Sequence, residues 1–317
     1  MQVKTNLYND YLNLLIQDKI PPFLVKYLTV PCLIRLKNIG YFCGMDYASK
    51  NIYDFKEKIS RYDHSLTVAL LVWKFTEDKK ATLAGLFHDI ATPCFSHVID
   101  YMNKDYETQE STEEYTEEII KSDQKLQKYL EEDNILVEDI IDFKKYTIVD
   151  NSRPKLCADR LDGIILTGMA WTKTIDKNDI IEIINDLEVY KNESQEIELG
   201  FKTCSVALKT LYTSNEIDKF CHTNEDNFMM ELLAEITKRT IDNKIIKYDE
   251  LYYLDEPTLL DKIRNSKIDE LKKLLNKFEN IMMTDIPVMI LNNVKVRDLN
   301  PLVNGIRLSD LSKMDNN

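Results

Sequence analysis

The chain has 317 residues, of which 44% are hydrophobic and 30% are charged, a composition that fits a globular protein and excludes wholesale disorder. Its formal net charge of −13 disfavours a duplex nucleic acid as partner, although a few arginines converging on one pocket can still bind a small anion. The first residues lack the basic and apolar pattern of an export signal, and no apolar run reaches membrane-spanning length. We therefore expect a cytoplasmic protein with no membrane partner.

Seven glycines and eight prolines are few for this length, so the composition favours helices over tight turns. Six cysteines occur, and none forms a close pair of the kind found in zinc knuckles or redox motifs. They are expected to be reduced thiols.

The first half of the chain shows two kinds of helical pattern. From Pro22 to Phe42 apolar residues recur at helical spacing, and Pro31 is expected to divide two helices. Residues 60–75 predict a helix with a nearly all-apolar centre, and residues 81–88 look the same. A helix that is apolar around most of its circumference is a buried one, so this pair is expected to lie in the core.

The rest of the chain remains helical in pattern. Residues 104–134 predict solvated helices with one narrow apolar face, whereas residues 155–170 predict another buried helix. Residues 146–149 predict a short strand or a helix end. Near the C-terminus, residues 256–283 predict further helix, and residues 288–296 predict a hairpin that turns at paired asparagines.

These patterns predict an all-α fold with a minor β-hairpin near the C-terminus. Residues 1–200 are expected to form the core domain, and residues 201–317 a helical extension packed on it.

The chain has only four histidines, and His64, His88 and His97 lie within 34 residues of one another. The pair His88-Asp89 ends an apolar helix, where a buried imidazole beside a buried carboxylate must be paired or metal-bound to offset desolvation. A purely structural pair is the alternative. Asp159 lies in a second apolar helix that would also bury its carboxylate.

Two imidazoles and two carboxylates form a mixed nitrogen and oxygen site suited to a divalent ion, which could be Mn²⁺, Fe²⁺, Mg²⁺, Zn²⁺ or Ni²⁺. A divalent ion held in this way can neutralise the charge that develops on phosphorus during phosphoester hydrolysis.

Three runs in chain order carry a resemblance to a known family. They are Ile59-Ser-Arg-Tyr-Asp-His-Ser-Leu-Thr-Val, Gly85-Leu-Phe-His-Asp-Ile-Ala-Thr-Pro-Cys-Phe-Ser-His-Val-Ile-Asp and Ala158-Asp-Arg-Leu-Asp-Gly. In these runs the chain resembles the HD-domain deoxynucleotide triphosphohydrolases, which include the SAM-and-HD-domain proteins and bacterial dGTP triphosphohydrolases. Weaker similarity extends the resemblance over most of the chain.

The resemblance implies a set of metal ligands, namely His64, His88, Asp89 and Asp159. It also implies that Arg61 and Arg160 hold substrate phosphates, a task that suits the planar guanidinium group. Surface ion pairs are the alternative for both arginines.

The resemblance assigns acid and base chemistry to His97, and Asp100, three residues later, could orient its ring. An ordinary helix-surface histidine is the alternative. Glu110 matches the acidic half of a catalytic His-Glu pair, although a shift of one residue in the alignment would place Gln109 there instead.

Four features depart from the family. Thr92 replaces a loop histidine, and residues 108–110 lack the histidine of the His-Glu pair. Gly163 replaces a tyrosine that packs against the nucleoside, and Thr167 replaces an aspartate that reaches the sugar hydroxyl. Deoxynucleotide preference is therefore less firmly implied than phosphohydrolysis.

Three functions follow as hypotheses. The first is metal-dependent hydrolysis of a deoxynucleoside triphosphate to nucleoside and triphosphate. The second keeps the chemistry but acts on a nucleoside monophosphate, a cyclic nucleotide or another phosphoester. The third is a catalytically weak nucleotide-binding protein with a structural metal. By resemblance, we expect a homo-oligomer.

Overall fold

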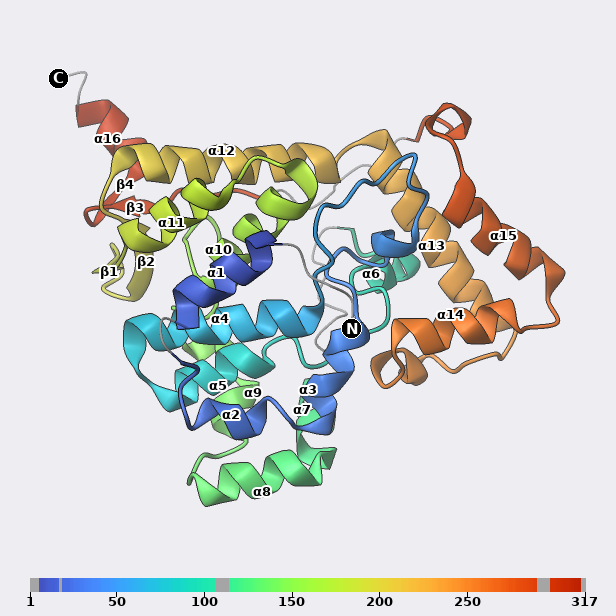
Figure 1. Cartoon of the computed structure of the whole chain (residues 1–317), viewed down its shortest axis with the longest axis horizontal. Coiled ribbons are helices and arrows are strands. Elements are labelled where there is room, and N and C mark those ends of the chain that lie inside the picture. Colours follow the sequence, from blue (N-terminus) through green and yellow to red (C-terminus); the bar gives the residue numbers. More distant parts are fainter. Residues whose placement is uncertain (1–5, 17–18, 107–113, 290–296, 315–317) are drawn as a thin grey trace.

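The computed structural model describes residues 6–16, 19–106, 114–289 and 297–314. Within these ranges the chain is mainly helical, as predicted, with a small sheet at one end (Figure 1). The α-helices are α1 (Asn6–Ile16), α2 (Leu24–Tyr27), α3 (Pro31–Arg35), α4 (Arg61–Thr76), α5 (Lys79–Phe87), α6 (Val98–Asn103), α7 (Thr116–Ser122), α8 (Gln124–Glu132), α9 (Glu138–Ile141), α10 (Ala158–Thr167), α11 (Lys177–Asp186), α12 (Cys204–Cys221), α13 (Asn224–Asp242), α14 (Glu256–Arg264), α15 (Asp269–Asn280) and α16 (Leu308–Met314). The strands are β1 (Leu187–Lys191), β2 (Ile197–Phe201), β3 (Leu302–Val303) and β4 (Ile306–Arg307).

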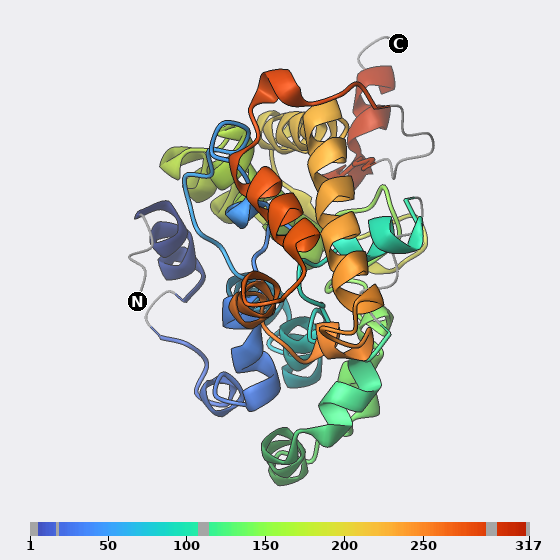
Figure 2. The same ribbon diagram turned by 90° about the vertical axis from the view of Figure 1, so that its right-hand side faces the viewer.

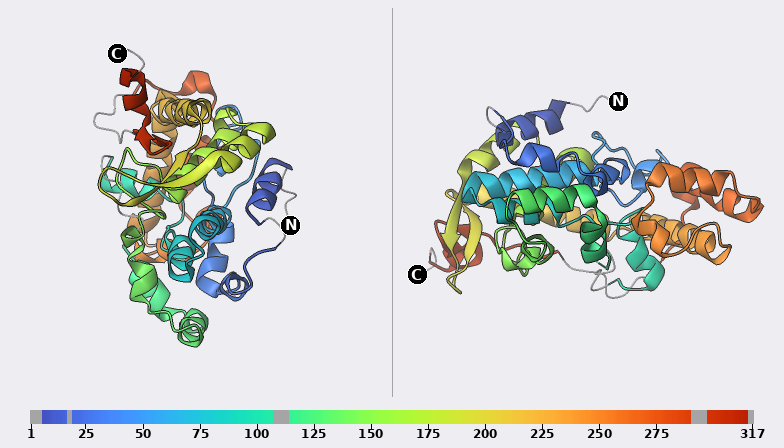
Figure 3. Two further views of the ribbon diagram at one scale, coloured as in Figure 1. Left: turned by 90° about the vertical axis from the view of Figure 1, so that its left-hand side faces the viewer. Right: turned by 90° about the horizontal axis from the view of Figure 1, so that it is seen from below.

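Helix α4 is central to the fold. It packs against α5, α10 and α1. Seen from below, it lies between the sheet at one end of the molecule and helices α14 and α15 at the other (Figure 3). Its first turn is fixed by a capping box, in which the Ser60 hydroxyl accepts from the Asp63 amide and the Asp63 carboxylate accepts from the Ser60 amide. The centre of α4 is buried, as its apolar sequence predicts.

Helices α13, α14 and α15 lie at the other end of the molecule, away from the sheet (Figure 1). Helix α15 packs along α13, and α14 lies below them near the end of α13 (Figure 2). The continuous pattern over 256–283 is divided into α14 and α15, because the chain turns at Asn265 and becomes extended at Ile268 before α15 begins. None of the described helices combines the length and the apolar character needed to cross a membrane.

The sheet joins distant parts of the chain. Its strand order is β1-β2-β3-β4: β1 and β2 pair antiparallel, β2 and β3 parallel, and β3 and β4 antiparallel. The strands β1 and β2 were not predicted, and the hairpin predicted over 288–296 falls largely on residues 290–296, outside the described residues. The pairing of β2 with β3 crosses the division proposed near residue 200, which stays a prediction.

Two further segments differ in detail from the sequence-based expectation. Residues 146–149 form a bend and a turn directly after a short 3-10 helix, Phe143–Lys145, so of the two alternatives the helix end fits and the strand does not. The buried helix expected from residue 155 begins at Ala158 and continues after α10 as a π-helical stretch, Gly168–Thr172.

Candidate metal centre

Three helix ends bring the predicted metal ligands together. His64 lies in the first turn of α4, and Asp159 lies in the first turn of α10. His88 caps the C-terminal end of α5, and Asp89 follows it in the turn. Because α4 packs against both α5 and α10, these ends meet at one point.

The donor atoms of the four side chains converge. His64 Nε2 lies 3.0 Å from Asp159 Oδ1, 3.2 Å from His88 Nε2 and 3.8 Å from Asp89 Oδ2. His88 Nε2 lies 3.5 Å from Asp159 Oδ1 and 3.7 Å from Asp89 Oδ1. Ligand bonds of about 2.0–2.2 Å place neighbouring donors of one ion about 3 Å apart, so this donor set fits a single divalent ion.

The outer ring nitrogens of both histidines are occupied by protein groups. His88 Nδ1 donates to the Gly85 carbonyl at 2.8 Å, and His64 Nδ1 lies 2.7 Å from a carboxylate oxygen of Asp162. Asp162 is fully buried, and its other oxygen accepts a 2.6 Å hydrogen bond from the Tyr11 hydroxyl on α1. With Nδ1 as donor, the Nε2 lone pair of each ring faces the centre, as metal ligation requires.

The imidazoles and carboxylates of the cluster stabilise each other's charged forms. Burial lowers the pKa of His64, but hydrogen bonds to Asp159 and Asp162 outweigh it and raise the pKa to about 10. Burial raises the pKa of Asp159, yet hydrogen bonds to His64 and His88 hold it well below its usual range. A divalent ion at this centre must therefore displace imidazole protons that the carboxylates stabilise.

Arg61 lies at the edge of the centre. Its guanidinium donates to Asp89 Oδ2 at 2.8 Å and to the Ser96 hydroxyl at 3.2 Å, and its side chain is buried. The residue predicted to hold phosphate thus also holds one of the predicted metal ligands in place.

A cavity of about 760 Å³ opens beside the centre. Its wall contains the four predicted ligands, arginines, aromatic residues and further polar and apolar residues, among them Asp150 and Asp226. The arginines on the wall are Arg61, Arg153, Arg160 and Arg297, and the aromatic residues include Tyr41, Phe42, Phe55 and Trp171. Arg153 and Arg297 were not predicted, because an isolated arginine outside a regular element carries no local signal that it faces a site.

His97 also lines this cavity. It precedes α6, is 31% exposed, and places Nδ1 2.9 Å from Asp100 Oδ2. Asp100 is fully buried, so this contact restrains the ring while its other nitrogen remains available to the cavity. The contact expected between the two residues is present, whereas their role in acid and base chemistry stays a prediction.

Two other positions from the sequence analysis, Glu110 and Thr92, remain to be placed. Glu110, together with Gln109, lies outside the described residues. Thr92 is buried, and its backbone carbonyl accepts a 2.7 Å hydrogen bond from Arg35, so the turn after Asp89 is fixed through its backbone.

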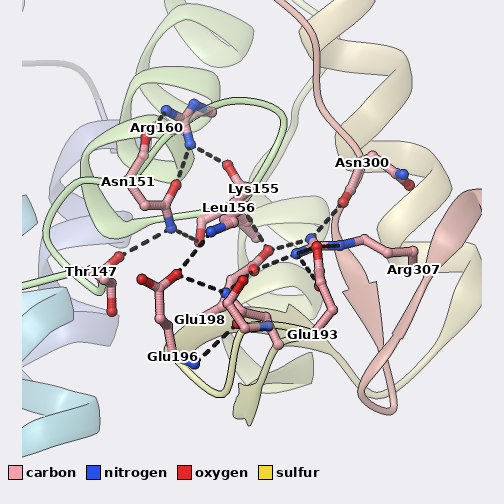
Figure 4. Close-up of polar contacts among 12 residues, drawn as sticks. Thr147, Asn151, Lys155, Leu156, Arg160, Glu193, Glu196, Glu198, Asn300 and Arg307 are labelled. Carbon is pink, nitrogen blue, oxygen red and sulfur yellow. Dashed lines mark hydrogen bonds and ion pairs between the residues drawn. The ribbon is translucent and has the colours of Figure 1, made fainter.

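Arg160 fixes the loop that precedes α10 (Figure 4). Its guanidinium donates to both the side chain and the backbone carbonyl of Asn151, at 2.8 Å each, and to the Lys155 carbonyl. Much of its hydrogen-bonding capacity is therefore used inside the protein, although the side chain borders the cavity. Its predicted contact with phosphate stays a prediction.

The same loop is anchored to the sheet. The Leu156 amide donates to the buried carboxylate of Glu198 on β2 at 3.1 Å, and Arg307 on β4 donates to that carboxylate at 2.6 Å (Figure 4). The Asn151 side-chain amide donates to the Leu156 carbonyl, which ties the two ends of the loop. The sheet therefore holds the loop that contributes residues to the cavity wall.

Residues 61–164 match the family model described as HD domain. The chain thus contains an HD domain, and together with the cluster of His64, His88 and Asp89 this indicates a metal-dependent phosphohydrolase with a divalent ion. Among curated proteins, a protein described as uncharacterized protein YdhJ, from Bacillus subtilis (strain 168), is 26% identical over 257 residues. That similarity covers 78% of this chain and 75% of the relative.

Substitution of Asp162 tests the support of His64. We expect Asp162→Asn to weaken binding of Mn²⁺ by about 10–100-fold, because the imidazole loses its carboxylate partner. Calorimetric titration of the metal-free protein measures this change, and Asp261→Asn, at an exposed position, serves as the matched control. Unchanged affinity in a folded Asp162→Asn protein would show that this contact does not support the metal.

Metal affinity should also depend on pH. The pKa of His64 is about 10 in the folded protein, above its ordinary value, so its proton competes with a metal at every pH below about 10. The affinity for Mn²⁺ should therefore rise by about tenfold or more per pH unit between pH 6 and 8. Titrations at constant ionic strength check this, and a constant affinity over that range would contradict it.

Proposed function

We propose that the protein hydrolyses a phosphoester of a nucleotide, with a deoxynucleoside triphosphate cut to nucleoside and triphosphate as the first candidate. The observation that carries this proposal is the His and Asp cluster that opens onto an arginine-lined cavity. A volume of about 760 Å³ lies within the range of small-molecule sites and suits a nucleotide-sized ligand.

The arginines of the cavity wall favour a polyanion, whereas Asp150 and Asp226, which also line the cavity, oppose this in part. Burial, followed by repulsion from Arg160 and Arg297, lowers the pKa of Arg153 to about 10. Positive groups that repel one another across a cavity gain stabilisation when an anion with several charges binds between them. This pattern supports a substrate with more than one phosphate.

A divalent ion, when bound by the four ligands, supplies Lewis-acid stabilisation of charge on the phosphoryl group and promotes attack by water. The protein's own groups provide the rest. Arg61 and Arg160 hold and orient the phosphates, with Arg153 and Arg297 as further cationic groups. His97, restrained by Asp100, transfers a proton to the departing sugar oxygen or helps to activate water.

A second candidate is hydrolysis of a nucleoside monophosphate, a cyclic nucleotide or another phosphoester. Gly163 and Thr167 favour it, because both line the cavity but neither supplies the sugar contact that the resemblance expects at its position.

A third candidate, a weak nucleotide-binding protein with a structural metal, is favoured by the buried Thr92, which cannot replace a catalytic histidine. Assembly into a homo-oligomer remains part of the proposal by resemblance.

A substrate screen distinguishes these candidates. Purified protein is incubated with Mn²⁺, Mg²⁺ or Fe²⁺ and with nucleoside tri-, di- and monophosphates and cyclic nucleotides. Release of free triphosphate supports the first candidate, whereas inorganic phosphate or a ring-opened nucleotide supports the second. Nucleotide binding without any metal-dependent product supports the third and contradicts hydrolysis.

His97 provides the sharpest single-residue test. Loss of a group that transfers a proton lowers turnover by roughly 10²–10⁴-fold, so we expect His97→Ala to reduce kcat by that amount with unchanged metal content. His222→Ala is the control, because His222 contacts Asp218 at the end of α12 and is absent from the cavity wall. Equal kcat in both variants would remove His97 from the mechanism.

A further inference from the structure

The side chain of Tyr41 lies at the junction of two parts of the cavity wall. On one side, its ring centroid is 5.0 Å from that of His64, and the Arg61 guanidinium lies 4.9 Å over the ring. On the other side, its ring meets Phe42 edge to face at 5.4 Å. Phe42 in turn stacks on Phe55 at 4.3 Å, which continues the aromatic wall. Tyr41 thus connects the metal centre to the aromatic part of the cavity.

The absence of a side chain at position 163 makes room for Tyr41. A Cβ atom built on Gly163 would lie 2.9 Å from the Tyr41 hydroxyl oxygen, closer than real Cβ contacts allow. Gly163 is four residues after Asp159 in α10, so both positions face the same side of the helix. The tyrosine hydroxyl therefore occupies the space next to the metal ligand that a side chain on α10 would otherwise fill.

The hydroxyl remains available for a ligand. Tyr41 lines the cavity, and among the described residues its hydroxyl makes no hydrogen bond to the protein. A tyrosine hydroxyl is neutral near pH 7 and can both donate and accept a hydrogen bond. A polar group of this kind beside a cavity is normally satisfied by solvent or by a bound molecule.

We propose that the Tyr41 hydroxyl hydrogen-bonds the alcohol part of the phosphoester, a sugar oxygen in the case of a nucleotide, and so determines specificity. The inference rests on the proposed function. Phosphates are matched by the metal centre and the arginines, whereas the aromatic wall suits a flat apolar group such as a base. The part of the substrate that joins these two is uncharged and rich in oxygen, and Tyr41 places a neutral donor at that junction.

Tyr41→Phe tests the inference, because it removes one oxygen atom and keeps the ring. Binding is measured by calorimetry in the presence of Ca²⁺. The ligands are the four deoxynucleoside triphosphates and, for comparison, inorganic triphosphate, which has no alcohol part. We expect about 3- to 10-fold weaker binding of at least one nucleotide, the loss expected for one neutral hydrogen bond, and unchanged binding of inorganic triphosphate. Tyr212→Phe on the exposed face of α12 is the matched control.

Gly163→Ala provides a second, independent test of the Tyr41 contact. Its methyl group would displace the Tyr41 hydroxyl, so the variant should lose nucleotide affinity in the same direction as Tyr41→Phe. In the double variant the two losses should not add, because both remove the same contact. Additive losses would show that Gly163 acts by another route and would count against the inference.

The outcomes separate the inference from the function on which it rests. Equal effects of Tyr41→Phe on nucleotides and on inorganic triphosphate, or no effect on either, overturn the role of Tyr41 even if the enzyme turns over. Binding of nucleotides that depends on Tyr41 but yields no metal-dependent product overturns the proposed hydrolysis alone. No nucleotide binding by the unaltered protein overturns both.

Discussion

The buried contact between His64 and Asp162 is the interaction on which the site depends. An imidazole and a carboxylate buried together are costly unless every polar atom finds a partner, and here Tyr11 satisfies the second oxygen of Asp162. The contact joins α4 to α10, and Tyr11 adds α1, the first helix of the chain. The packing of these helices and the orientation of the His64 imidazole are therefore one structural requirement.

A second layer of support comes from the other end of the fold. The loop before α10 carries cavity-lining residues, and it is held by Glu198 on β2, which is itself paired with Arg307 on β4. Since β3 and β4 come from the last part of the chain, the cavity wall depends on residues far outside the HD domain match at 61–164. The matched region supplies the predicted ligands, and the remainder of the chain helps to shape the cavity that they face.

Local sequence patterns predicted the main helices and singled out the four side chains whose donor atoms converge, because both depend on short-range signals. That these side chains bind a metal stays a prediction. The apolar centre and capping residues of α4 lie within one segment, and the His-Asp pair is adjacent in the chain. Other features could not be predicted, because they depend on which distant segments touch. These are the hydrogen bond of Tyr11 to Asp162, the contact of Tyr41 with Gly163, and the positions of Arg153 and Arg297 on the cavity wall. The strands β1 and β2 were missed because their alternation is short and their sheet is completed by residues about a hundred positions later.

The hydrogen bond between Arg61 and Asp89 has a thermodynamic consequence. One guanidinium serves both a carboxylate in the predicted metal shell and the cavity in which a phosphate would lie. An anion that draws Arg61 toward itself leaves more of the Asp89 charge for the cation, and a cation that engages Asp89 frees Arg61 for the anion. Metal and anion affinities are then linked, and the linkage must be equal in both directions.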